Sequence, residues 1–225
     1  MKYRFLYIAL GFALINWIAA TKKWKWLVYI TKPAVLLALI AYVVQLRPYL
    51  ISPTGHFNWL LVALIFSMVG DIFLMLPGNL FIPGLISFLM AHVAYIISFA
   101  SISTFSFNAA FVIVIVMVAL TAYQIFQRIS DTLKHTNNTK MQIPVFIYIG
   151  TVAIMVIMAL HTLVSNSFEN YRALFASGGA LLFLVSDTWL AWDRFVEPIP
   201  WRDFRVMATY HVGQAFLCLG FLMTF

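Results

Sequence analysis

The sequence predicts an all-helical, polytopic membrane protein: a bundle of about eight transmembrane helices. Of its 225 residues, 64% are hydrophobic. Only 9% are Asp, Glu, Lys or Arg, whereas soluble domains carry roughly 25% charged residues. Apolar runs close to the ~20 residues that span a bilayer follow one another with short connections. So few charges cannot cover a water-facing surface, and we expect a single transmembrane domain over residues 1–225.

Charged residues, prolines, glycines and asparagines delimit the apolar runs. Thr21-Lys22-Lys23 closes the first run. Only Leu76-Pro77-Gly78-Asn79 separates the third run from the fourth, so these two must form an antiparallel pair. A polar connection over 128–142 follows the fifth run, and we interpret it as a solvated cytoplasmic loop. In chain order, the predicted spans are 3–20, 27–46, 58–76, 80–100, 108–127, 143–162, 172–192 and 205–225.

An even number of spans places both termini on one side of the membrane. The basic residues of the connections are divided 4 to 9 between the two sides: Lys2, Arg4, Arg47 and Arg172 against Lys22, Lys23, Lys25, Arg128, Lys134, Lys140, Arg194, Arg202 and Arg205. The positive-inside rule therefore predicts that both termini lie outside the cytoplasm. The host membrane is the cell membrane if the source is bacterial and an endomembrane if it is eukaryotic. Orientation also accounts for the net charge of +7, and we expect no nucleic-acid partner.

Ionisable residues inside the spans are the most informative ones. Five of the 7 acids fall in connections, which leaves Asp71 and Asp187 within apolar runs. Lys32 is the one basic residue inside a span. A charged side chain at the centre of a membrane helix costs roughly 2.5 to 3.5 kcal/mol on insertion scales, so each needs a reason to be there.

These residues share one depth. At about 1.5 Å of rise per residue, Asp71, Asp187, Lys32 and Tyr210 lie roughly 6 to 8 Å inside the cytoplasmic boundary, with Asn16 near the same level. Gln214 follows one turn beyond Tyr210, and His92 and Tyr95 reach toward the midplane. Singly, such residues are interfacial or snorkel to the headgroups; together they favour a shared functional cavity.

For most of the remaining cysteine, histidine and glycine residues, the sequence favours a structural role. Cys218 lies in an apolar run and has no partner for an internal disulfide, which favours buried packing. We expect His56 and His161 to be interfacial, whereas His211 either lines the cavity or faces a neighbouring helix. His92 alone is equally compatible with a ligand and with a hydrogen-bonded core histidine. Gly178 and Gly179 favour close helix packing.

Five segments, those around Lys32, Asp71, His92, Asp187 and Tyr210, resemble the YhhN-like lysoplasmalogenase family over essentially the whole chain. The most specific are the Gly-Asp pair that ends Ser67-Met68-Val69-Gly70-Asp71 and the Ser-Asp pair that ends Leu182-Phe183-Leu184-Val185-Ser186-Asp187. The others are Thr31-Lys32-Pro33, His92-Val93-Ala94-Tyr95 and Tyr210-His211-Val212-Gly213-Gln214. The resemblance implies an integral membrane hydrolase that cleaves the vinyl ether bond of lysoplasmalogens, releasing a fatty aldehyde and a glycerophospho-base.

The residues suit that chemistry. Vinyl ether hydrolysis protonates the β carbon, forms an oxocarbenium ion and adds water, a task for one protonated acid and one carboxylate. Asp71 and Asp187 are the candidate catalytic pair, and the sequence leaves open which of them is the acid. Lys32 suits either the substrate phosphate or an aspartate. The other candidate substrate-binding residues are Asn16, His92, Tyr95, Ser186, Tyr210 and Gln214.

Two alternatives remain open at the sequence level. Asp71, Asp187, His92 and His211 together are the donors that a metal-dependent hydrolase would use, although no His-x-x-x-His pair occurs. Buried acids also relay protons in transporters, but the chain shows no obvious inverted repeat. The leading hypothesis needs no metal or cofactor, and the sequence leaves the oligomeric state open.

Overall fold

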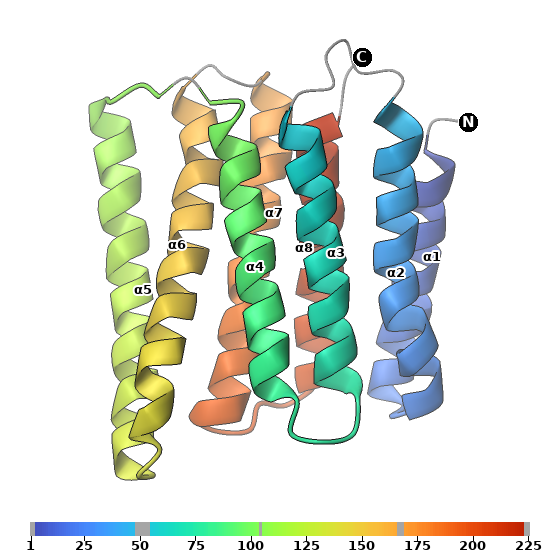
Figure 1. Cartoon of the computed structure of the whole chain (residues 1–225), viewed down its shortest axis with the longest axis vertical. Helices are drawn as coiled ribbons and strands as arrows, with labels where there is room; N and C mark the ends of the chain where they lie inside the picture. Colours follow the sequence, from blue (N-terminus) through green and yellow to red (C-terminus); the bar gives the residue numbers. More distant parts are fainter. Residues whose placement is uncertain (1–2, 48–54, 104, 166–168, 223–225) are drawn as a thin grey trace.

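The computed structural model describes residues 3–47, 55–103, 105–165 and 169–222, which are almost entirely helical (Figure 1). The eight α-helices of this described part are α1 (Arg4–Thr21), α2 (Lys25–Leu46), α3 (Gly55–Met75), α4 (Phe81–Ala100), α5 (Ala109–His135), α6 (Gln142–Val164), α7 (Asn170–Phe195) and α8 (Arg202–Leu222). They run up and down, with both chain ends at the top of Figure 1. The predicted all-helical bundle is confirmed.

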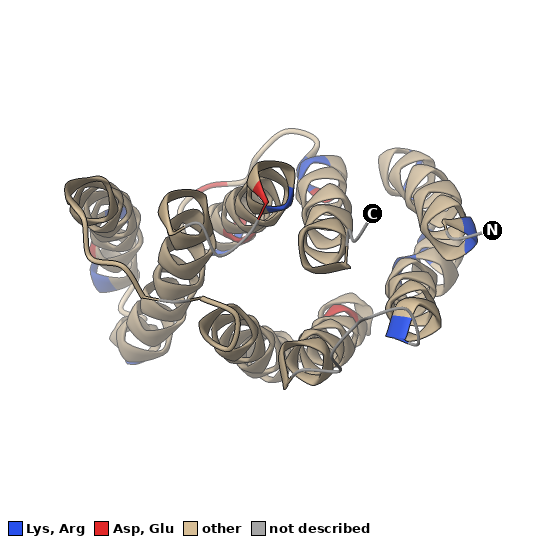
Figure 2. Cartoon of the chain, turned by 90° about the horizontal axis from the view of Figure 1, so that it is seen from above, with Lys and Arg blue, Asp and Glu red and all other residues tan. Residues whose placement is uncertain are grey.

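Seven of the helices form a closed ring, seen from above in Figure 2. Around the ring, each of α1, α2, α3, α4, α6, α7 and α8 packs against the next, and α8 closes the ring on α1. Helix α5 stands outside, packed mainly on α6, with only 11% of its most apolar stretch buried. A helix this apolar and this exposed belongs in lipid.

Within the described residues, seven helices are long and apolar enough to cross a membrane. Helix α8 matches them in length but is more polar, because it carries Tyr210, His211 and Gln214, all of them buried inside the bundle. These polar side chains face protein rather than lipid, and Gln214 and His211 form hydrogen bonds there.

The prediction of a solvated loop over 128–142 is wrong. Helix α5 continues to His135, a single 3₁₀ turn follows at Thr139–Met141, and α6 begins at once. Ile129 and Leu133 are buried and pack with Val145 of α6. Residues four apart lie on one helix face, so these two apolar side chains hold the last turns of α5 against α6. Figure 1 shows α5 and α6 projecting past the other helices at this end.

Glycines set the closest helix contacts. A Cβ on Gly179 would meet the backbone oxygen of Gly213 and the nitrogen of Leu217 at 2.7 Å, and one on Gly220 would meet the backbone of Ala176 at 2.6 Å. Helices α7 and α8 therefore touch backbone to backbone, as small residues allow in membranes. The turn between α3 and α4 needs a glycine for a different reason, since Gly78 has φ of +121°.

Candidate active site

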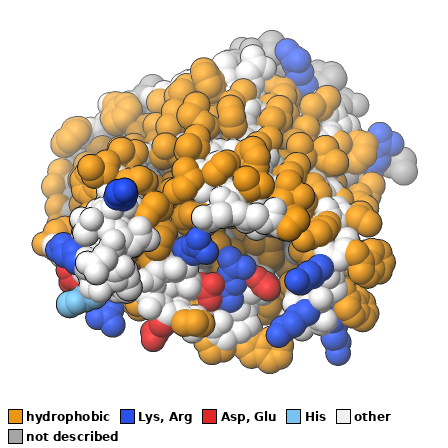
Figure 3. All heavy atoms as spheres, turned by 60° about the horizontal axis from the view of Figure 1, so that its bottom comes forward, with side chains coloured by type: hydrophobic (Ala, Val, Ile, Leu, Met, Phe, Trp, Pro, Cys, Tyr) orange, Lys and Arg blue, Asp and Glu red, His pale blue; other side chains and the backbone are white. Residues whose placement is uncertain are grey.

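A cavity of about 540 Å³ opens at the end of the ring opposite the termini. Its walls come from α2, α3, α4, α7 and α8, and its mouth from the α1–α2 and α3–α4 connections. Figure 3 shows basic and acidic side chains gathered around a hollow on this face. Five of the nine residues predicted to form the site line it: Lys32, Asp71, Ser186, Asp187 and Tyr210.

On one side of the cavity, Lys32 of α2 pairs with Asp71 of α3. The ammonium nitrogen lies 3.0 Å from Oδ1 of the carboxylate, and both side chains are almost fully buried. Beside them, Asn16 of α1 donates to the hydroxyl of Thr31 at 2.9 Å and ties α1 to α2. A buried charge needs a close partner of opposite sign, and in this cavity Lys32 and Asp71 are that partner for each other.

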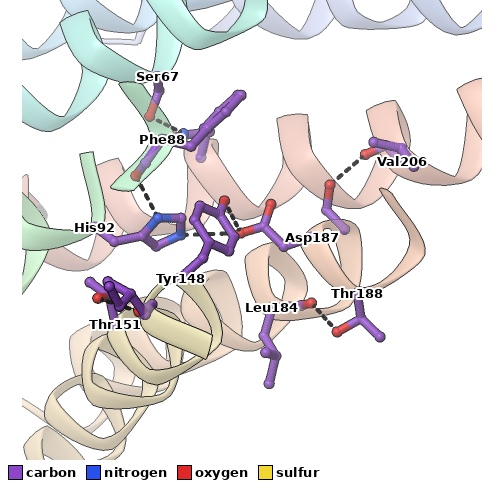
Figure 4. A network of polar contacts seen from close by, with 12 residues as sticks. Ser67, Phe88, His92, Tyr148, Thr151, Leu184, Asp187, Thr188 and Val206 are labelled. Atoms are coloured by element: carbon purple, nitrogen blue, oxygen red, sulfur yellow. Dashed lines mark hydrogen bonds and ion pairs between the residues drawn. The ribbon is translucent and has the colours of Figure 1, made fainter. Parts of the chain in front are cut away.

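On the other side, Asp187 of α7 has uncharged or titratable partners (Figure 4). The hydroxyl of Tyr148 on α6 donates to Oδ2 at 2.8 Å, and Nε2 of His92 on α4 lies 3.3 Å from the same oxygen. The other ring nitrogen, Nδ1, lies 2.6 Å from the carbonyl oxygen of Phe88. A carbonyl only accepts hydrogen bonds, so Nδ1 carries a hydrogen. With a hydrogen on Nδ1, the other ring nitrogen of His92, Nε2, faces Oδ2 of Asp187.

Aromatic rings pack around the inner part of the cavity. Phe88, which lines it, meets Phe183 and Tyr210 edge to face, with centroids 6.2 and 5.8 Å apart. The ring of His92 lies 4.7 Å from that of Phe183. Phe88 fits against α3 because Gly70 has no Cβ; a Cβ there would lie 2.7 Å from the ring. The glycine before Asp71 thus lets α4 approach closely enough to bring His92 into the site.

Four of the predicted residues lie behind the cavity rather than on its surface. Tyr95 donates to the side-chain oxygen of Gln214, whose amide nitrogen donates to Ser67 at 3.0 Å. Asn16 and His92 are likewise fully buried, in the contacts described above. Among the described residues, none of the four is part of the cavity lining. These side chains tie α1, α3, α4 and α8 into the frame around the cavity.

Comparison with known proteins agrees with this architecture. The model of the YhhN family matches residues 27–221. The chain belongs to the YhhN family. The human protein named lysoplasmalogenase TMEM86B is 32% identical over 179 residues, which cover 77% of this chain and 68% of that protein. The rat protein of the same name is 29% identical over 216 residues, covering 96% and 81%. No solved structure matches the chain significantly.

Sequence reasoning about this YhhN-family protein missed Tyr148. It is one of many aromatic residues in the predicted spans, so its residue type alone does not indicate a role in the site. Its position does: Tyr148 lies six residues from the start of α6 at Gln142, or about 9 Å deep, near the depth assigned to Asp71 and Asp187. The same counting placed His92 deeper than the acids, toward the midplane. Nε2 of His92 nevertheless lies 3.3 Å from Oδ2 of Asp187.

The other histidines take structural places. His161 is fully buried against the rings of Phe105 and Phe111, with centroids 5.0 and 4.4 Å away, three residues before α6 ends at Val164. His211 accepts a hydrogen bond from the indole of Trp17 at 3.2 Å. Within the described part of the chain, no three His, Cys, Asp or Glu side chains are arranged to hold a metal ion.

Cys218 is buried, as the sequence indicates. His56 lies near the start of α3 and is half-buried.

Proposed function

We propose that this YhhN-family protein is a lysoplasmalogenase that hydrolyses the vinyl ether of a single-chain ether lipid by acid–base catalysis. The observation that carries the proposal is the pairing of two buried carboxyl groups in one cavity with opposite kinds of partner. Asp71 faces an ammonium group, whereas Asp187 faces a histidine and a tyrosine hydroxyl. The names of the human and rat relatives support the same activity.

Asp187 is the proton donor in this mechanism. We place its acidic proton on Oδ1, because His92 and Tyr148 both engage Oδ2, which leaves Oδ1 to meet the substrate. Transfer of that proton to the β carbon turns the vinyl ether into an oxocarbenium ion. The hydroxyl of Tyr148 then stabilises the new carboxylate, since a hydrogen bond to a charged group is stronger than one to a neutral group.

Asp71 is the base. Held ionised by Lys32, it stabilises the oxocarbenium ion and takes a proton from the water that adds to the α carbon. The hemiacetal then collapses: Asp71 returns its proton to the departing glycerol oxygen, and the Asp187 pair takes the proton of the hemiacetal hydroxyl. The products are an aldehyde and an alcohol, one water is consumed, and both acids regain their starting states.

The cavity walls suit a single-chain lipid. Leu74, Phe88, Leu190 and Val206 give apolar surface around the acids, while Ser186 and Tyr210 bring hydroxyl groups to the same wall. Ser186 donates to the carbonyl oxygen of Val206 at 3.1 Å. We assign these two hydroxyls to orienting the water and the glycerol. Asn16, His92, Tyr95 and Gln214 position this machinery from behind the wall.

The test is incubation of the purified full-length protein with lysoplasmalogen, with its 1-acyl ester analogue and with its saturated 1-alkyl ether analogue, with aldehyde as the readout. Aldehyde from the vinyl ether alone is the expected result. Its release should continue after exhaustive chelation, because the scheme uses no metal. Uptake of a solute into proteoliposomes, with no aldehyde from any of the three lipids, would contradict the hydrolase proposal and favour a transporter.

A further inference from the structure

The cavity mouth carries two lysines, and Asp203, the acid of the same rim, is paired with Arg202. Lys23 and Lys25 line the mouth, and within the described residues neither forms an ion pair. A third cation of the mouth, Arg202, is already engaged: it bonds Asp203 at 2.6 Å and lies 3.3 Å from Asp193. The mouth therefore presents a local positive charge on the α1–α2 side, where the first turn of α2 also holds no acid.

The same segment is placed at the level of lipid headgroups. Trp24 and Trp26 alternate with the two lysines, and their side chains are 49% and 65% exposed. Exposed tryptophans at helix ends mark the boundary between hydrocarbon and water. The lysines therefore stand where the phosphates of membrane lipids stand, which favours a lipid over a phosphate ion from solution.

A phosphate cannot take the inner position at Lys32. The ammonium group of Lys32 is committed to Asp71, and a phosphate beside it would meet two acids in a buried site. The vinyl ether of a substrate bound in this way would also have to lie deeper still, among Tyr95 and Gln214, which do not line the cavity. The phosphate must therefore bind nearer the mouth.

The spacing between mouth and acids matches the substrate. Lys25 and Lys32 are seven residues apart on α2, which is about 10 Å along the helix. In a lysoplasmalogen, seven bonds separate the phosphorus from the β carbon of the vinyl ether, which is about 8 Å when extended. With the phosphate at Lys23 and Lys25, the reacting carbon lies level with the carboxyl groups.

We propose that Lys23 and Lys25 form a subsite that binds the phosphodiester of a single-chain glycerophospholipid. Its distance from the two acids matches the distance from the phosphate to the vinyl ether of that lipid. The identity of the bound lipid rests on the proposed function. In this arrangement Lys23 and Lys25 bind the phosphate, a role that the sequence left open for Lys32. This arrangement predicts that the phosphodiester, rather than choline or ethanolamine, supplies most of the headgroup affinity.

The experiment measures binding of two uncleavable probes to the full chain in maltoside micelles, which contain no phosphate. The probes are a 1-alkyl lysophosphatidylcholine and the corresponding 1-alkylglycerol. In the Lys23→Gln/Lys25→Gln double variant, the dissociation constant of the phospholipid should rise about tenfold, because two charge-assisted contacts are lost at a partly solvated site. Affinity for the alkylglycerol should change less than twofold.

Lys22→Gln is the matched control. Lys22 is exposed in the same connection and carries the same charge, but it is not among the described lining residues. An equal loss of affinity in this variant would reduce the effect to general attraction by a basic loop. Unchanged phospholipid binding in the double variant would overturn the subsite. Strong, lysine-dependent competition by inorganic phosphate alone would overturn its assignment to a lipid.

The binding measurement does not depend on turnover. If wild-type protein binds the phospholipid through the two lysines but releases no aldehyde from lysoplasmalogen, the proposed hydrolysis fails and the phosphodiester subsite stands. If aldehyde is released and the double variant is unaffected in binding, the subsite fails and the hydrolase stands.

Discussion

At the scale of single residues, the different partners of the two acids carry the argument. An ammonium nitrogen lies 3.0 Å from Asp71, whereas Oδ2 of Asp187 meets the imidazole of His92 and the hydroxyl of Tyr148. Depth counting from the sequence brings Lys32, Asp71, Asp187 and Tyr210 to one level. It cannot reveal the partners, because these depend on how the helices are rotated and tilted in the ring.

Asp71→Asn should abolish aldehyde release and also destabilise the protein. The neutral amide leaves the Lys32 ammonium buried and unpaired, which costs about 3 kcal/mol or more. Lys32→Met added to this variant should restore the thermal unfolding temperature in micelles, because an apolar residue replaces the unpaired charge. It should not restore activity, because the base is still missing.

Recovery of aldehyde release in that double variant would show that Asp71 only neutralises Lys32. Asp187→Asn is the companion change: it should also abolish the activity, but with a smaller loss of stability, since no buried lysine is left without a partner.

Tyr148→Phe tests the residue that sequence reasoning missed. It removes the hydrogen bond to Oδ2 of Asp187, and the loss of a bond to a charged group corresponds to a roughly tenfold or greater fall in kcat. KM should hardly change, because Tyr148 is not among the described residues that line the cavity. Steady-state kinetics separate the two parameters.

Tyr123→Phe is the control for this change. Its hydroxyl accepts a hydrogen bond from Gln127 on the exposed face of α5, far from the acids in the fold. This variant should match wild type in both parameters. A rise in KM with unchanged kcat for Tyr148→Phe would show that Tyr148 binds substrate and does not support Asp187 in catalysis.

At the scale of helices, the sequence predicts which segments are helical better than where they end. Hydropathy marks the apolar core of each span, but the ends depend on what packs beyond the bilayer. Helix α5 illustrates this, since Ile129 and Leu133 pack on α6 and carry the helix through a region of polar composition. The short turn at Pro77 and Gly78 is the opposite case, because its residue types alone define the antiparallel α3–α4 pair.

The contact between α7 and α8 gives a prediction at this scale. Gly179→Ala places a methyl group 2.7 Å from the backbone of α8, so the two helices that carry Asp187 and Tyr210 must separate. Overpacking typically costs about 1 to 3 kcal/mol, more than the gain of about 0.8 kcal/mol in helix propensity. Thermal unfolding in micelles should show a lower midpoint.

Gly150→Ala on α6 is the matched change, because a Cβ there meets no atom within 4 Å. The same substitution should leave the unfolding midpoint unchanged or raise it slightly. Equal destabilisation of both variants would mean that the loss comes from glycine's own flexibility and not from the α7–α8 contact.

At the scale of the whole molecule, the orientation in the membrane determines which leaflet supplies the substrate. Both chain ends lie at one end of the bundle and the cavity mouth at the other (Figure 1). The 4-to-9 division of basic residues predicts that the mouth faces the cytoplasm, although Lys2 in that count lies outside the described residues. Substrate then enters from the cytoplasmic leaflet, and the water-soluble product leaves into the cytoplasm.

Thiol labelling tests this orientation directly, because Cys218 is fully buried and gives little background. Glu169→Cys places a thiol on the terminal side and Lys134→Cys places one at the end of the bundle where the mouth opens, both at exposed positions. A membrane-impermeant maleimide should label Glu169→Cys in intact cells and Lys134→Cys only after permeabilisation. The reverse pattern would put the mouth outside the cytoplasm, and the phosphodiester subsite would then draw its lipid from the opposite leaflet with its chemistry unchanged.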